Sequence, residues 1–177
     1  MRKVLLLAAV LFTLLTLAAA QKDKSQRPSP PAQAQCKLPD GKTITVDYSS
    51  PRAKGRKIFG GLVPYGEVWR TGANEATTFV TDANLTVGKL AIPAGSYTIF
   101  TVPTPGKWTL IINKKTGEWG IPYKYEADEL GRVDMKVSVT SGPVENFTIA
   151  FDQRSNTCQL TLSWENTQAS VGIVEGK

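Results

Sequence analysis

Short segments in which apolar and polar residues alternate recur along most of the chain. In residues 43–48, Ile44, Val46 and Tyr48 share one face, and residues 132–139 place valine or methionine at every second position in the same way. Such alternation predicts β-strands with one buried face. The other predicted strands are residues 76–81, 84–87, 89–92, 96–102, 108–112, 147–151, 160–164 and 169–174.

Turn-forming residues separate these segments, and no segment shows a sustained helical period. Gly88 lies between two predicted strands, and Pro105-Gly106 precedes another. Residues 123–131 have room for one or two helical turns only. The pattern predicts a single all-β domain of about nine or ten antiparallel strands, as in sandwiches and barrels. An antiparallel β-sandwich of jelly-roll or Greek-key type is the first prediction, and a closed barrel is the alternative.

The first twenty residues have the features of an export leader. Arg2 and Lys3 precede an apolar run over residues 4–17, and Ala18-Ala19-Ala20 fits a small-residue cleavage site. We therefore expect a signal peptide over residues 1–20, with an uncleaved anchor as the alternative. After its removal no remaining segment is apolar enough to span a bilayer. The expected location is exported, in the periplasm or secreted, and not integral to the membrane.

The mature chain divides into a tether and a domain. Residues 21–35 are polar and rich in proline, and they contain no large apolar side chain. Such a segment cannot bury enough apolar surface to offset the entropy of ordering it. We expect a disordered tether over residues 21–35 and a single folded domain over residues 36–177.

The two cysteines of the chain, Cys36 and Cys158, lie near opposite ends of this domain. Exported proteins meet an oxidising compartment in which paired cysteines are common. The sequence therefore predicts a Cys36–Cys158 disulfide, and two free thiols are the alternative.

The composition excludes several functional classes. The chain has no histidine, which removes Ser-His-Asp and Cys-His catalysis and every histidine-containing metal site. It has 21 Lys+Arg and 15 Asp+Glu, and loss of Arg2 and Lys3 leaves 19 against 15, a net charge of +4. The positive charges are scattered rather than concentrated beside stacking aromatics, which argues against a nucleic-acid partner. No cofactor and no metal site is predicted.

Residues 50–75 do not follow the strand pattern. This stretch is long for a connection, and long ordered connections are commonly functional. Its sequence SPRAKGRKIFGGLVPYGEVWRTGANE, together with IPAGSYTIFTVP, WTLIINKKTGEWG and LSWENTQASVGI further along, resembles the family called domain of unknown function 2911. The resemblance extends from about residue 44 to about residue 173 and implies a small exported bacterial β-rich domain. It implies no activity and no catalytic residue, and the cysteine pair is not part of the family pattern.

Three groups of residues are candidates for a binding site. Arg70 can hold an anion while Asn74 and Glu75 orient a polar ligand, although a buried Arg70–Glu75 ion pair that fixes the loop is an alternative. Arg52 and Arg56 belong to a basic cluster that is either an anion-binding patch or a solvated loop. The aromatic candidates are Trp69, Trp119 and Tyr123, of which the last two lie in a predicted loop.

These features favour a non-catalytic binding module over an enzyme. The expected ligand is an envelope glycan, an anionic small molecule or a partner protein. A hydrolase that uses carboxylates is the alternative from another class, drawing on the acidic residues Asp47, Glu67, Glu75 and Glu118. A structural or assembly module without a small-molecule ligand is the third hypothesis.

Overall fold

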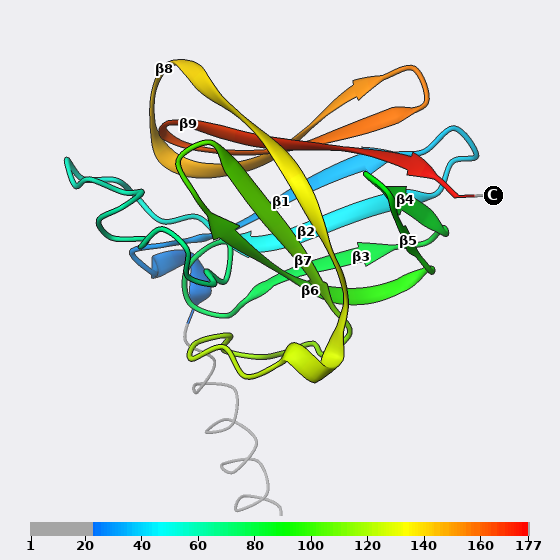
Figure 1. The fold of residues 1–177 in the computed structure, drawn as a ribbon, viewed down its shortest axis with the longest axis horizontal. Coiled ribbons are helices and arrows are strands. Elements are labelled where there is room, and N and C mark those ends of the chain that lie inside the picture. The colour runs from blue at the N-terminus through cyan, green and yellow to red at the C-terminus, as the bar shows by residue number, and fades with distance from the viewer. Residues whose placement is uncertain (1–22, 177) are drawn as a thin grey trace, which may run out of the picture.

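The structure of the chain is a computed structural model that describes residues 23–176. Within these residues, the regular structure consists of nine strands and two short 3₁₀ turns (Figure 1). The elements are η1 Lys24–Gln26, β1 Pro31–Lys37, β2 Thr43–Ser49, β3 Thr77–Thr81, β4 Leu85–Val87, β5 Leu90–Ile92, β6 Gly95–Pro103, β7 Lys107–Asn113, η2 Glu126–Asp128, β8 Glu129–Arg154 and β9 Thr157–Glu175.

All nine strands belong to one antiparallel sheet with the order β1-β2-β3-β6-β7-β8-β9-β4-β5. The predicted all-β class, the strand number and the scarcity of helix are confirmed. The packed layers come from this single sheet, which bends over itself, because β8 and β9 are long enough to run through both layers (Figure 1).

Strands β8 and β9 each merge two segments that the alternation pattern separates. β8 contains residues 132–139 and 147–151, and its pairing with β9 shifts register between Val139 and Thr148. β9 contains residues 160–164 and 169–174, which are joined through an irregularity at Glu165, whose φ is +54°. Such bulges bend a strand without ending it. The strands therefore continue through positions at which the sequence pattern changes phase.

The ordered domain begins before Cys36, which corrects the expected boundary of the tether. β1 starts at Pro31, and Ala34 and Cys36 are buried against the core. Residues 31–35 are ordered because they pair with residues 45–49 of β2, so backbone hydrogen bonds offset the small apolar area of their side chains. The expected signal peptide at residues 1–20 lies outside the described residues.

A seam between β2 and the second half of β8 closes the bent sheet. At one end the Ala53 amide donates to the Glu145 carbonyl, and the Phe147 amide donates to the Pro51 carbonyl, both at 2.8 Å. In the middle, the Ile149 amide donates to the Tyr48 hydroxyl at 3.1 Å. Main-chain groups on both sides of the seam are therefore paired although no continuous ladder joins them.

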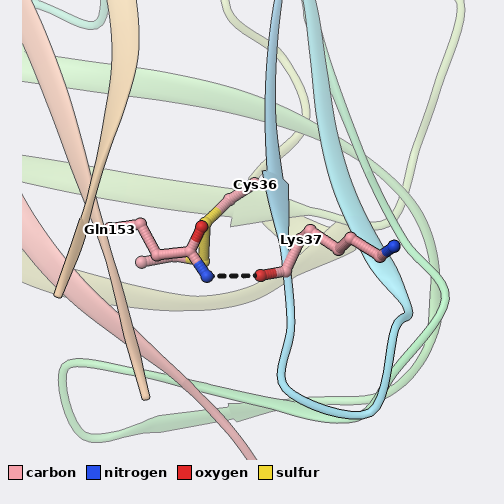
Figure 2. The surroundings of a disulfide bond; sticks show 4 residues. Cys36, Lys37 and Gln153 are labelled. Carbon is pink, nitrogen blue, oxygen red and sulfur yellow. Dashed lines mark hydrogen bonds between the residues drawn. A yellow bond between two sulfur atoms is a disulfide. The ribbon is translucent and has the colours of Figure 1, made fainter. Parts of the chain in front are cut away.

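The Cys36–Cys158 disulfide fixes the other end of the seam, as Figure 2 shows. It joins β1 to the start of β9, and both cysteines are buried. Beside it, the Gln153 side-chain amide donates to the Lys37 carbonyl at 2.8 Å. The disulfide predicted from the compartment argument is thus present in the structure.

Aromatic side chains fill the space between the layers. Trp69 stacks on Trp164 with ring centroids 5.9 Å apart, and Phe59 meets Trp108 edge-on at 4.7 Å. Phe147 completes the cluster at 4.9 Å from Trp69. Phe59 and Trp69 both come from residues 50–75, so this long connection is anchored in the core.

We expect the disulfide to contribute substantially to stability because it closes a loop between residues 122 apart. Replacing both cysteines, Cys36→Ser with Cys158→Ser, should lower the free energy of unfolding by about 2–5 kcal/mol, as for other native disulfides. Urea denaturation with and without reductant measures this loss. Reductant should destabilise the natural chain and leave the double variant unchanged, and equal stability of the two proteins would contradict the prediction.

Tyr48→Phe tests the middle of the seam. The change leaves the Ile149 amide without its partner, and an unsatisfied buried amide costs about 1–3 kcal/mol. Urea denaturation should show a loss of this size. The matched control is Tyr65→Phe, because Tyr65 is 42% exposed and its hydroxyl makes no hydrogen bond with the described residues. Equal effects of the two substitutions would contradict this role for Tyr48.

Candidate functional site

Trp69, one of the expected ligand-binding residues, lies in the core. Only 7% of it is exposed, and its indole N–H donates to the Gly72 carbonyl at 3.0 Å. Its ring contacts the aromatic cluster described above. Trp69 therefore positions the neighbouring Arg70 and does not itself reach a ligand in solvent.

Arg70 and Trp119, 49 residues apart in the sequence, are brought together at the surface. Nη1 of Arg70 donates to the Trp119 carbonyl at 3.0 Å and also to the Asn74 carbonyl. The guanidinium lies over the indole ring, 4.8 Å from its centroid, which is a cation–π contact. Burial lowers the pKa of Arg70, which stays protonated because an arginine pKa is so high.

The loop that carries Trp119 follows β7 and is fixed from several sides. The Ala76 amide donates to the Glu118 carbonyl at 3.0 Å. Gly120 has a φ of +89° and packs so closely that a Cβ there would lie 2.9 Å from the Cβ of Ala76. The position requires glycine for its backbone angle and for this approach. Trp119 is consequently 55% exposed on a backbone that is held in place.

Tyr123 belongs to the support of this loop and is only half-exposed. Its ring packs on Phe100 at 4.8 Å and on Tyr125 at 5.6 Å, forming a small apolar cluster on the outer side of β6 and β7. Its hydroxyl donates to Glu129 at 2.7 Å. Burial, and then this hydrogen bond, raise the pKa of Tyr123, so the phenol stays neutral. Of the two candidate aromatic residues in this loop, Trp119 is therefore the exposed one.

Buried Asn113 ties the same loop to the end of β7. Its side-chain amide donates to the Tyr125 carbonyl at 2.7 Å, and its side-chain oxygen accepts from the Lys115 amide at 2.9 Å. Asn113 and Glu129 were absent from the sequence-based candidates. Asn113 follows the predicted strand 108–112, and Glu129 lies in residues 123–131, where one or two helical turns were expected. Sequence alone does not show which loop they contact.

Asn74 and Glu75 bind the segment that precedes β1, so the expected Arg70–Glu75 ion pair does not form. Asn74 donates to the Ser29 carbonyl at 3.0 Å. The Glu75 carboxylate accepts from Arg27 at 2.7 Å and lies 3.5 Å from the Lys24 ammonium. The hydrogen bond from Arg27 is the main reason why the pKa of Glu75 falls from 4.5 to about 2.

Arg52 and Arg56 lie away from this group and donate mainly within their own loop. Arg52 donates to Ser50, and Arg56 donates to the Ala53 carbonyl at 3.0 Å and to the Arg52 carbonyl at 2.6 Å. Arg56 and Lys57 line an open cleft of about 490 Å³ that Glu145 and Glu165 border on the other side. The mixed charge of this cleft does not favour an anion.

The carboxylates considered for hydrolysis are dispersed. Glu118 lies 3.7 Å from Lys115, and Asp47 accepts from the side chain of Gln33. Asp47 and Glu75 border a common cleft, which has a volume of about 170 Å³. A general acid needs a raised pKa, whereas the pKa of Glu75 is lowered. Within residues 23–176, no three potential metal ligands lie together.

The geometry defines an all-β domain with an aromatic core and a fixed loop that exposes one tryptophan. Residues 29–173 match the family described as Protein of unknown function (DUF2911). The chain belongs to this family, in agreement with the resemblance of residues 50–75 and the three further motifs. Comparison with the curated proteins and with the solved structures gave no match.

The ion pair at Glu75 predicts a specific titration. A carboxyl with a lowered pKa stabilises the docked segment above pH 4.5, and this contribution disappears as the pH falls towards 2. NMR titration of the Glu75 carboxyl should give a midpoint near 2, and Arg27→Gln should move the midpoint towards 4.5. Arg154→Gln removes the exposed partner of Asp152 and should leave the Glu75 midpoint unchanged. A midpoint near 4.5 in the natural chain would contradict the contact.

Proposed function

We propose that this protein is an exported, non-catalytic binding module that holds a sugar ring of an envelope glycan against Trp119. The observation that carries the proposal is the exposure of Trp119 on a fixed loop. Large aromatic side chains supply much of the affinity of binding surfaces, and a fixed side chain loses little entropy when a ligand binds. Ile121, two residues further along the same loop, is also exposed, at 43%.

The arrangement around the indole defines how a ring would bind. Arg70 occupies one face of the indole, so a ligand would stack on the opposite face. We call the indole face that would contact the ligand the Trp119 platform. The described hydrogen bonds of Arg70 all involve Nη1, so its other guanidinium nitrogens are available to donate to hydroxyl oxygens at the edge of this platform. An apolar face with hydrogen-bond donors at its margin is suited to a sugar ring, which has C–H groups on its faces and hydroxyls around its edge.

The same features favour binding over hydrolysis. Arg70 and Trp119 supply positive charge and apolar surface, and neither can act as a general acid or base near neutral pH. Glu118, the nearest acidic candidate in sequence, is engaged by Lys115. A glycosidase instead needs two carboxyl groups placed on either side of the scissile bond.

The expected location supports an envelope ligand. The leader-like residues 1–20 predict export, and a buried disulfide is compatible with an oxidising compartment. Within the part of the chain that the structure describes, no helix has the length and apolar character needed to cross a bilayer.

Trp119→Ala tests the platform directly. The purified protein is titrated with soluble peptidoglycan fragments and neutral oligosaccharides by isothermal calorimetry. The natural chain should bind at least one of them, and the substitution should weaken that binding by about tenfold or more, equivalent to about 1.4 kcal/mol. Circular dichroism should show an unchanged fold, because the ring is mostly outside the core.

Tyr65→Ala is the matched control, since Tyr65 is another exposed aromatic residue of a loop. Its affinity should equal that of the natural chain. Unchanged binding in Trp119→Ala would overturn the platform. Binding of a partner protein or of a simple anion in place of every glycan would assign the domain to one of the other ligand classes considered above.

A further inference from the structure

The bent β8–β9 ribbon carries another concave surface, on the side that faces away from the aromatic core. We call it the β8–β9 trough. Its volume is about 340 Å³, and every lining residue is polar. The lining residues are Lys136, Ser138, Asp152, Arg154, Gln159, Thr161, Gln168 and Ser170.

The trough is a consequence of the way in which the ribbon bends. Lys136 pairs with Ser170 in one half of the ribbon, and Asp152 pairs with Gln159 in the other half. The irregularity at Glu165 changes which positions of β9 face inwards: Leu162 and Trp164 are buried before it, whereas Ala169 and Val171 are buried after it. Polar residues of both halves consequently remain on one outer surface.

Two observations show that the two halves of the ribbon approach each other. The Gln168 side-chain amide donates to the Ser163 hydroxyl at 3.0 Å, which joins the two parts of β9 across the irregularity. On the same face, a Cβ at Gly172 would lie 3.7 Å from Oε1 of Gln159. The lining side chains therefore converge on one volume rather than spreading over a flat sheet.

Several of these side chains have donors and acceptors that no hydrogen bond within the described residues uses. Arg154 and Asp152 pair with each other at 2.6 Å, and Thr161 donates to the Ala150 carbonyl. By contrast, the side chains of Lys136, Ser138, Gln159 and Ser170 make no hydrogen bond or ion pair with residues 23–176. The trough thus presents one uncompensated ammonium group together with an amide and two hydroxyls.

This set of groups specifies the chemistry of a ligand. The charges of Asp152 and Arg154 compensate each other, so the remaining charge of Lys136 favours a ligand with one negative charge. Amide and hydroxyl groups that both donate and accept match the hydroxyls of a polyol. We propose that the β8–β9 trough binds an acidic sugar, with the carboxylate on Lys136 and the ring hydroxyls on Gln159, Ser138 and Ser170.

The test is an NMR titration of the purified chain with glucuronate, glucose and acetate in parallel. Glucuronate should cause saturable shifts of the backbone amides of residues 136, 138, 159 and 170. Its dissociation constant should be at least tenfold lower than those of glucose and acetate. Equal binding of acetate would reduce the trough to a simple anion site, and equal binding of glucose would remove the role of Lys136. Either result overturns the proposal, as does an absence of shifts at these residues.

Substitutions locate the site and separate it from the Trp119 platform. Lys136→Gln and Gln159→Ala should each raise the dissociation constant for glucuronate tenfold or more. Lys89→Gln, which changes an exposed lysine of the β4–β5 turn, is the matched control and should have no effect. Trp119→Ala should also leave glucuronate binding unchanged, so either binding site can be refuted without the other. Unchanged affinity in both Lys136→Gln and Gln159→Ala would overturn the assignment.

Discussion

Closure of the sheet along the seam between β2 and β8 is the constraint on which the other features depend. The second half of β8 pairs with β9 but not with β7, so its other side has no strand partner in the sheet, and such an open side invites pairing with other chains. The pairing of residues 51–53 with residues 145–147, the Tyr48 hydroxyl and the disulfide hold this side against β1 and β2. Once the seam is closed, the apolar faces of both layers enclose the tryptophan cluster.

The seam also determines where the long connection lies. Residues 51–53 continue β2 into the seam, and Phe59 and Trp69 then anchor the rest of the connection in the core. Arg70 follows directly from this buried anchor, so its guanidinium is held where it meets Trp119. The proposed platform is therefore an extension of the core packing, and its rigidity has the same origin as the stability of the domain.

The two proposed sites use different parts of one architecture. The platform lies on a loop that is packed against β6 through the Phe100–Tyr123–Tyr125 cluster. The trough lies on paired strands whose inner face is core and whose outer face is polar. The two proposals differ in chemistry: the platform would contact a sugar through an aromatic ring, and the trough would contact it through charge and hydroxyl groups.

The sequence by itself determined the all-β class, most of the strands and the pairing of Cys36 with Cys158. Period-two alternation and turn residues are local signals, and a chain with two cysteines can form only one intramolecular bridge. Local signals also indicated that residues 50–75 pack against the domain, since that stretch contains large apolar side chains. They did not reveal β1, because Ala34 and Gln35 give too weak a pattern without the pairing to β2.

Only the tertiary structure decided which side chains share a site. A Gly-Glu pair precedes both Trp69 and Trp119 in the sequence, yet Trp69 fills the core and Trp119 faces solvent. Glu75 is paired with Arg27 rather than Arg70, and residues 136 and 159 line one cleft although they come from different halves of a bent ribbon. These outcomes depend on contacts between residues far apart in the chain, which are fixed by the closure and bending of the sheet rather than by local sequence.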